Sequence, residues 1–315
     1  MRLDLVLRRH LADVDAATRT QVQAWIENGH VTVNGVPVHR TAARAAAGDV
    51  VTVALPPSPP RTAMAAEDVP LNILYEDDQL LALDKPAGVV VHPSYKNAAG
   101  TVLNALLWHA RGWPVGQRPS LVGRLDKGTS GILVVAKTAA SHAALQRAMA
   151  SSVAEKDYLV VVYGRVKMAR GEIALRLAHD PMDRRRMVAL SSTGNVGAPS
   201  LTRFERLACV AASRAGLSLL RCRLVTGRTH QIRAHLAARN WPPVGDPVYG
   251  EPRWTSIADP ILAAALRAFA RPALHAWRLA FAHPVTHRRV LVEAPIPSDF
   301  ECLLTAAGLI RSVRL

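Results

Sequence analysis

A run of prolines divides this chain of 315 residues into two parts of unequal size. Four of the five residues from Pro56 to Pro60 are prolines, and such a run favours an extended spacer over a helix or a central strand. The sequence therefore predicts a small N-terminal module over residues 1–55, a linker over residues 56–69 and a larger domain over residues 70–315. Half of the residues are apolar, which is enough to fill a sizeable core and excludes a wholly disordered chain.

The small module has the pattern of a compact αβ unit. Residues 2–10 and 18–28 both have helical periodicity. Asn34-Gly35 lies between two alternating apolar segments, which is typical of a β-hairpin, and a further strand is expected over residues 50–54. The pattern by itself is also consistent with a mere folding appendage.

The larger domain combines strand and helix signals, with strands in the majority. Short segments rich in valine, leucine and tyrosine predict strands, and two segments with helical periodicity predict helices. We expect strands at residues 72–75, 80–83, 132–136, 157–163 and 217–225, and helices at residues 141–150 and 229–239. Thr229 is the expected N-cap of the last helix. The larger domain is therefore predicted to be a strand-rich α/β fold.

The chain is strongly basic, and nearly all of the excess lies in its larger part. Lysine and arginine number 39 against 24 acidic residues, a formal net charge of +15 with a sequence pI near 10.7. Residues 1–60 contribute only +1 of this charge. An arginine-dominated excess of this size favours a polyanionic partner, most often a nucleic acid, over a merely solvated surface. The densest run, Arg184-Arg185-Arg186, is either a solvated face or an RNA contact, and we favour the contact.

Four classes of protein do not fit this sequence. The cysteines Cys209, Cys222 and Cys302 are odd in number and far apart, which argues against a disulfide framework and against a zinc site. No apolar run approaches the roughly 18 residues that a membrane span needs. The first residues alternate charged with apolar side chains, unlike a secretory signal peptide, and we therefore expect a cytoplasmic protein.

A glycine-rich loop carries the strongest chemical signal. Residues 123–131 read Gly-Arg-Leu-Asp-Lys-Gly-Thr-Ser-Gly, with Asp126 between two basic neighbours. A phosphate loop is rejected, because Thr129 stands where that motif needs lysine and a strand follows where a helix should begin. Two interpretations remain on the residues alone. Asp126 forms a salt bridge in a surface turn, or it is a catalytic carboxylate kept ionised by a basic partner.

The loop belongs to an ordered set of sequence blocks that span most of the larger domain. The blocks lie at residues 83–93, 123–131, 155–164, 226–235, 245–250 and 274–284. This set resembles the RluA-type family of RNA pseudouridine synthases, from about Leu71 to Pro297. Two of the blocks are each specific, namely Arg-Leu-Asp-x-x-Thr-Ser-Gly and Gly-Arg-Thr-His-Gln-Ile-Arg. Their occurrence together and in this order makes the resemblance more specific still.

The N-terminal module also resembles a known family. Residues 2–4, 21–35 and 48–50 are similar to the small S-four-like RNA-binding domain of ribosomal and RNA-modifying proteins. Arg19 follows Thr18 where that family usually has Ser-Arg. This domain is common in RluA-type synthases that modify large-subunit ribosomal RNA, so the resemblance implies that substrate for the whole chain.

The resemblance implies both a fold and an activity. The fold is α/β (α+β), with a mixed, mostly antiparallel central sheet and the small N-terminal αβ module. The activity is isomerisation of uridine in RNA: the base–sugar bond breaks, the base turns, and the bond forms again through carbon five. This chemistry needs no cofactor, no nucleotide and no metal. The alternatives are a non-catalytic RNA-binding or ribosome-assembly factor and the same enzyme acting on transfer RNA, and a monomer is expected in each case.

Three residues match the active-site positions of the family. Asp126 matches the catalytic aspartate, which acts at the ribose either as nucleophile or as base. Tyr158 matches the tyrosine that stacks on the target base. Arg228 matches the active-site arginine and is the expected ionic partner of Asp126, with Arg233 as the weaker candidate.

The resemblance also suggests which basic residues contact RNA. They are Arg124, Lys127, Lys156, Arg233, Arg184, Arg185, Arg186 and Arg19. The remaining polar residues of the blocks, His92, His230, Gln231, His235 and His275, are expected to support the fold. Two positions depart from the family: Gly123 stands where many relatives have histidine, and Gly128 where many have aspartate or another polar residue.

Overall fold

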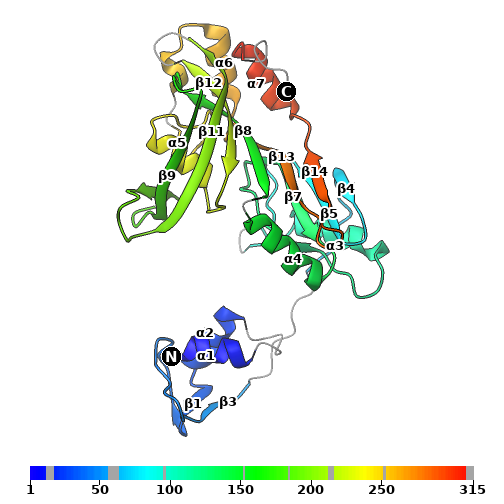
Figure 1. The fold of residues 1–315 in the computed structure, drawn as a ribbon, viewed down its shortest axis with the longest axis vertical. Helices are drawn as coiled ribbons and strands as arrows, with labels where there is room; N and C mark the ends of the chain where they lie inside the picture. The colour runs from blue at the N-terminus through cyan, green and yellow to red at the C-terminus, as the bar shows by residue number, and fades with distance from the viewer. Residues whose placement is uncertain are drawn as a thin grey trace. The chain divides into compact units, whose positions relative to one another are not determined.

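The computed structural model describes residues 1–11, 18–55, 64–94, 97–151, 153–183, 185–211, 216–250 and 253–309. These residues form two compact units, Met1–Met64 and Ala65–Leu315 (Figure 1). The division falls inside the expected linker, of which residues 56–63 lie outside the described part of the chain.

The N-terminal unit combines two helices with a three-stranded antiparallel sheet. The elements are α1 (Leu3–His10), α2 (Arg19–Glu27), β1 (Val31–Val33), β2 (Val36–Pro37) and β3 (Val51–Val53), and the sheet order is β2-β1-β3. Asn34 and Gly35 form the hairpin turn with φ of 52° and 82°, a conformation that these two residue types tolerate. Leu3, Val22 and Ile26 are fully buried in the core between helices and sheet. Both helices and the hairpin predicted for this module are present.

The larger unit is built on one extended sheet. Its strands are β4 (Ile73–Glu76), β5 (Leu80–Lys85), β6 (Ser120–Leu121), β7 (Ser130–Ala136), β8 (Glu155–Tyr163), β9 (Arg170–His179), β10 (Met187–Leu190), β11 (Ala198–Val210), β12 (Leu217–Leu224), β13 (Leu274–Ala282) and β14 (Arg289–Glu293). The order is β10-β9-β11-β12-β8-β13-β7-β5-β4, with β14 beside β13 and β6 beside β7. Within the described ranges every pair is antiparallel except β13 with β7. The predicted mixed, mostly antiparallel sheet is confirmed.

The parallel pair determines where the glycine-rich loop ends. Ser130, the first residue of β7, pairs with His275 of β13, and Gly131 pairs with Ala276. Gly131 has a φ of 110°, and a Cβ atom there would overlap the carbonyl group of Ala276. Glycine therefore allows β13 to approach this closely, and the loop that carries Asp126 leads directly into the middle of the sheet.

Helices pack on the sheet and at its ends (Figure 1). They are α3 (Val102–His109), α4 (Ala139–Ala150), α5 (Gln231–Ala238), α6 (Pro260–Ala268) and α7 (Ser298–Ala306), with short 3-10 helices η1 (Ala110–Gly112) and η2 (Arg253–Ser256). α4 packs against β7 and β13, and α5 against β9, β10 and β11. Ile232 and Leu236 of α5 share a core cluster with Phe204 of β11. None of the helices in the described ranges is both long and apolar enough to cross a membrane.

The helix that was expected to begin at Thr229 begins two residues later. His230 is its N-cap residue, with a left-handed φ of 52° and no capping hydrogen bond from its side chain. The Thr229 hydroxyl instead accepts a hydrogen bond from Nη2 of Arg124 at 3.0 Å. The side-chain oxygen of Gln231 accepts from the backbone N–H of Arg228 at 3.0 Å and stabilises the turn. The prediction of Thr229 as N-cap is therefore wrong.

Candidate active site

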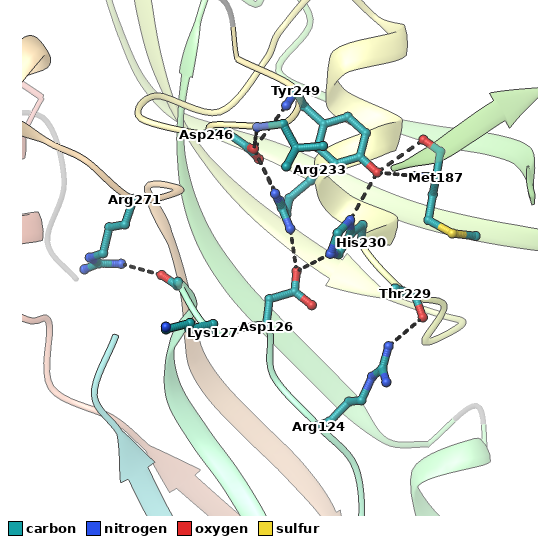
Figure 2. Close-up of polar contacts among 12 residues, drawn as sticks. Arg124, Asp126, Lys127, Met187, Thr229, His230, Arg233, Asp246, Tyr249 and Arg271 are labelled. Atoms are coloured by element: carbon teal, nitrogen blue, oxygen red, sulfur yellow. Dashed lines mark hydrogen bonds and ion pairs between the residues drawn. The ribbon is translucent and has the colours of Figure 1, made fainter. Parts of the chain in front are cut away.

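Asp126 lies in the loop between β6 and β7 and lines a cavity of about 910 Å³. Tyr158, His230 and Arg233 line the same cavity, although they come from distant parts of the chain. Oδ2 of Asp126 lies 2.9 Å from Nη1 of Arg233 (Figure 2). The other oxygen, Oδ1, makes no hydrogen bond with any described residue. Asp126 thus presents one held and one free oxygen to the cavity.

A second, buried carboxylate fixes the arginine that holds Asp126. Nε and Nη2 of Arg233 form a fork on Asp246 with distances of 2.6 and 2.8 Å. Asp246 Oδ1 also accepts from the backbone N–H groups of Val248 and Tyr249. Burial opposes the charge of Arg233, but the hydrogen bonds and charges of Asp246 and Asp126 outweigh burial and raise its pKa. Arg233 is therefore a permanent cation of fixed orientation beside Asp126.

This geometry changes which arginine pairs with Asp126. Arg228 lines the cavity and is exposed, and within the described part of the chain its side chain has no hydrogen bond or ion pair. Arg233 lies one turn into α5, and its side chain is only 5% exposed. Three of its five N–H groups donate to Asp246 and Asp126. In the structure Arg233, and not Arg228, is the ionic partner of Asp126, and the contact of Arg233 with RNA stays a prediction.

Tyr158 forms part of the cavity wall. It lies in β8, where it pairs with Cys222 of β12 and Ala276 of β13. Burial and, to a lesser extent, the charge of Asp126 raise the pKa of Tyr158 to about 12. Its hydroxyl makes no hydrogen bond with the residues that the structure describes. A neutral phenol next to Asp126 is thus available to a ligand in the cavity.

Comparison with known proteins identifies the family to which this chain belongs. The profile of the RNA pseudouridylate synthases matches residues 79–238, a segment that contains Asp126, Tyr158 and Arg233, and the S4 domain profile matches residues 1–51. The chain belongs to the RNA pseudouridylate synthase family. The predicted family, the fold class and the activity class, an isomerase of uridine in RNA, are thereby confirmed.

Relatives of this synthase match along almost the whole chain. A ribosomal large subunit pseudouridine synthase D from Neisseria meningitidis serogroup B is 38% identical over 308 residues, which cover 98% of this chain and 79% of the relative. The protein of the same name from Xylella fastidiosa is 40% identical over 92% of this chain and 84% of its own. Among solved structures, human RNA pseudouridylate synthase domain containing 1 is 26% identical with a TM-score of 0.56, over 72% of this chain and 84% of its own.

The sequence interpretation missed His230 as a neighbour of the synthase's carboxylate. Nε2 of His230 lies 3.6 Å from Oδ2 of Asp126, and Nδ1 lies 3.2 Å from the hydroxyl of Tyr249. The left-handed backbone at His230 ends the loop before α5. One signal was available in the sequence: the Gly-Asp-Pro-Val-Tyr-Gly block contains Asp246 and Tyr249, which complete this arrangement.

A buried lysine anchors the loop just after Asp126. Lys85 is fully buried, and its Nζ donates to the carbonyl groups of Pro86, Val89 and Lys127 at 2.8, 2.9 and 3.4 Å. Burial lowers the pKa of Lys85 to about 8. The backbone N–H of Gly88 also donates to the Lys127 carbonyl at 2.7 Å. The carbonyl group of Lys127, the residue after Asp126, is thus held by two donors.

The departure at Gly128 has a steric reason in this synthase. A Cβ atom at Gly128 would lie 2.8 Å from Cδ of Pro272, which precedes β13. Nη1 of Arg271 donates to the Gly128 carbonyl at 3.4 Å, and its Nε and Nη2 form a fork on Asp299 of α7. Gly123, the other departure, has open space around it. The Arg271-Pro272 segment therefore requires glycine at one of the two positions.

The other predicted RNA contacts are spread over several parts of the molecule. Arg124 is exposed and lines the cavity. Lys156 also lines it, but its Nζ donates to the carbonyl of Met149 at 2.9 Å, and burial lowers its pKa. Lys127 is exposed but does not line the cavity. The cavity thus brings together Arg124, Lys156 and Arg228.

Arg185 and Arg186 do not line the cavity, and Arg19 belongs to the N-terminal unit. Arg185 pairs with Asp183 at 2.9 Å, and the guanidinium of Arg186 lies 5.7 Å from the ring centre of Tyr249. Arg184 lies outside the described residues. Arg19 is an exposed residue of α2 in the N-terminal unit.

Two histidines of the sequence blocks support the fold. His235 is fully buried between the hydroxyls of Ser200 and Thr202, at 2.8 and 3.0 Å. His275 is fully buried, and its Nδ1 lies 3.0 Å from the Ser130 hydroxyl. Burial lowers the pKa of each to about 4. His92, by contrast, lines the cavity, where burial and the charge of Arg124 lower its pKa.

Proposed function

We propose that this synthase isomerises specific uridines of large-subunit ribosomal RNA and that Asp126 is its catalytic carboxylate. The observation that carries the proposal is the ion pair between Asp126 and the buried Arg233 at the wall of the cavity. The proposed substrate is supported by the relatives named ribosomal large subunit pseudouridine synthase D, which match nearly the whole chain.

Asp126 acts at the ribose of the target nucleotide. The carboxylate either attacks the sugar carbon and displaces the base or removes a sugar proton so that the base leaves. Both routes need an ionised carboxylate with an oxygen facing the substrate. Arg233, oriented by its fork on Asp246, holds Oδ2 of Asp126 and leaves Oδ1 without a partner among the described residues. Oδ1 of Asp126 is therefore the proposed reacting atom.

Tyr158 is proposed to hold the detached base and to assist the last proton transfer. Its ring in the cavity wall offers a face for stacking of the uracil. After the base turns and carbon five joins the sugar, the proton on carbon five must leave. With a pKa near 12, the hydroxyl of Tyr158 stays neutral and relays that proton as a hydrogen-bonding group. The proton is finally taken up by N1 of the base, which no longer bonds the sugar.

Exposed basic residues at the cavity are proposed to bind the RNA around the target. Extruding a uridine from a helix costs a few kcal/mol, and phosphate contacts offset this cost. Arg124 and Arg228 are exposed at the cavity and fit this role. The N-terminal unit, with Arg19, is proposed to add a sequence-independent contact through its S4-type fold.

The proposal is tested by mapping pseudouridine in cellular RNA. We expect one or a few sites in large-subunit ribosomal RNA to disappear when the gene is deleted and to return with the wild-type chain, but not with Asp126→Asn. Sites lost from transfer RNA alone would identify the alternative substrate. Purified protein that binds ribosomal RNA transcripts but forms no pseudouridine on them would indicate the non-catalytic alternative.

A further inference from the structure

His230 contacts Asp126, but the proposed chemistry gives it no task. Its Nε2 lies 3.6 Å from Oδ2 of Asp126, on the oxygen that Arg233 also contacts. Its Nδ1 lies 3.2 Å from the Tyr249 hydroxyl, as Figure 2 shows. That hydroxyl accepts from the backbone N–H of Met187 at 2.7 Å and lies 3.2 Å from the Met187 carbonyl. The chain of contacts therefore runs from the edge strand β10 to Asp126.

We propose that His230 is a positioning residue that faces Asp126 with an Nε2–H group, and that Tyr249 holds this tautomer by donating its hydroxyl hydrogen to Nδ1. The inference rests on the proposed role of Asp126. With His230 and Arg233 both on Oδ2, the carboxylate cannot rotate freely, and Oδ1 stays toward the substrate. The 3.6 Å contact is longer than a hydrogen bond, and such contacts often shorten when substrate fills a site.

The hydrogen of the Tyr249 hydroxyl has two acceptors at equal distance. If it goes to the Met187 carbonyl, the oxygen must accept from Nδ1–H of His230, and a lone pair of Nε2 then faces the Asp126 carboxylate. If it goes to Nδ1, Nε2 carries the hydrogen and faces the carboxylate favourably. A hydrogen bond to a charged acceptor is about twice as strong as one between neutral groups. The carboxylate therefore selects the Nε2–H tautomer.

Only a neutral imidazole, with one ring N–H group, has distinct tautomers, and the surroundings of His230 favour the neutral form. Burial lowers the pKa of His230, and the positive charges of Arg233 and Arg124 act in the same direction. The charges of Asp126 and Asp246 act in the opposite direction and do not outweigh them. His230 is neutral at neutral pH, so that one ring nitrogen carries a hydrogen and the other a lone pair.

Two substitutions at His230 separate this role from a backbone role. His230 has a φ of 52°, which asparagine tolerates much better than glutamine. The amide nitrogen of glutamine takes the place of Nε2, whereas that of asparagine takes the place of Nδ1. If His230 served only its left-handed backbone, His230→Asn would be the better substitute. We expect the reverse in activity: kcat about 10-fold lower for His230→Asn and within about 3-fold for His230→Gln, with KM little changed.

Nitrogen-15 NMR of the histidine rings reads the tautomer directly. His283 supplies an internal reference, because its Nδ1 accepts from the backbone N–H groups of Val285 and Thr286, which leaves Nε2–H to donate to Asp77 at 3.0 Å. We expect His230 to show the same Nε2–H pattern in the wild-type chain, with its signal assigned from its loss in His230→Gln. In Asp126→Ala we expect it to change to Nδ1–H.

Tyr249→Phe tests the second half of the arrangement. Without the hydroxyl we expect His230 to show a mixture of tautomers and kcat to fall several-fold. Tyr75→Phe is the matched control, because it removes a hydroxyl that donates to Asp77 at 2.6 Å outside this cavity, and it should leave the His230 signal unchanged.

The two proposals fail in different ways. An Nδ1–H pattern for His230 in the wild-type chain, no change in Asp126→Ala, or higher activity of His230→Asn than of His230→Gln would overturn the role of His230. A wild-type chain that forms no pseudouridine, with an Nε2–H pattern intact, would instead overturn the proposed function. Wild-type activity with the expected order of variants and the expected tautomers would support both.

Discussion

Two clusters in this molecule contain the same three residue types and are used in opposite ways. In the first, Tyr75 and His283 both contact Oδ2 of Asp77, while the backbone N–H groups of Gln79 and Leu80 donate to Oδ1. In the second, Tyr249 contacts His230, His230 faces Oδ2 of Asp126, and Oδ1 has no partner among the described residues. Below, these are called the closed cluster and the open cluster.

The difference between the two clusters shows what distinguishes a structural carboxylate from a reactive one. Burial opposes the charge of Asp77, but four hydrogen bonds outweigh it and lower its pKa. Both oxygens of Asp77 are saturated, so nothing is left for a ligand. Asp126 is instead stabilised by one buried cation, Arg233, on one oxygen. Because Arg233 contacts only Oδ2, Oδ1 of Asp126 has no partner among the described residues and is left for the substrate.

The largest expected effect separates the two aspartates by activity. Asp126→Asn should lower kcat by about 1,000-fold or more, because an amide can neither attack the sugar nor take its proton. Asp77→Asn should keep kcat and lower the free energy of unfolding by about 2 kcal/mol, because hydrogen-bonded groups lose their acceptor. Single-turnover kinetics measures the activity of each variant, and urea denaturation measures its free energy of unfolding. Equal loss of activity in both variants would remove the distinction between the clusters.

The next effect concerns the support of the open cluster. Asp246→Asn should lower the free energy of unfolding by about 3 kcal/mol, because it leaves the buried guanidinium of Arg233 short of one negative charge. Activity should fall as well, since Arg233 is then free to turn from Asp126. Urea denaturation of Asp246→Asn and of Asp126→Asn compares the free energies of unfolding of the two variants. If Asp246→Asn lowered the free energy of unfolding less than Asp126→Asn does, Asp126 and not Asp246 would be the main partner of Arg233.

A third effect concerns histidines that face no carboxylate. His235 and His275 are bound to hydroxyls, and burial lowers the pKa of each to about 4. Between about pH 6.5 and 4 the unfolded chain therefore binds protons that the folded chain does not, so stability falls as pH is lowered through this range. Each histidine should add a slope of up to about 1.4 kcal/mol per pH unit.

Urea denaturation from pH 7 to pH 4.5 measures this slope. His235→Gln should reduce the slope by its share, and His275→Gln should do the same. A slope unaffected by His235→Gln would contradict the assignment.

The smallest expected effect is steric and lies in the loop of the open cluster. Gly128→Ala should lower the free energy of unfolding by about 1 kcal/mol, because the new Cβ would lie 2.8 Å from the Pro272 ring. Gly123→Ala is the matched control, since no atom lies within 4 Å of its Cβ, and it should not destabilise the fold. Thermal denaturation compares the two. If Gly128→Ala were as stable as Gly123→Ala, the segment around Pro272 would have to move and make room for the new Cβ atom.

Much of the fold could be predicted because its signals are local. The apolar runs that predicted strands at residues 132–136 and 157–163 correspond to β7 and β8, and the Asn34-Gly35 turn is where the hairpin was expected. The start of α5 could not be predicted, because the turn before it is held by Gln231, whose amide nitrogen donates to the Leu201 carbonyl of β11. Contacts with another strand leave no pattern near Thr229.

Asp126 and Tyr158 could be predicted as candidate site residues because their sequence blocks are specific, and the structure places both at one cavity. The sequence by itself determined the family, the order of the elements and this loop, since each depends on residues near one another in the chain. Tertiary structure alone decided that Arg233 rather than Arg228 pairs with Asp126. The two arginines lie five positions apart in one block, and 107 positions separate Arg233 from Asp126. Which of the two arginines is buried depends on how α5 packs on the sheet and on the position of Asp246, whose carboxylate binds the buried guanidinium.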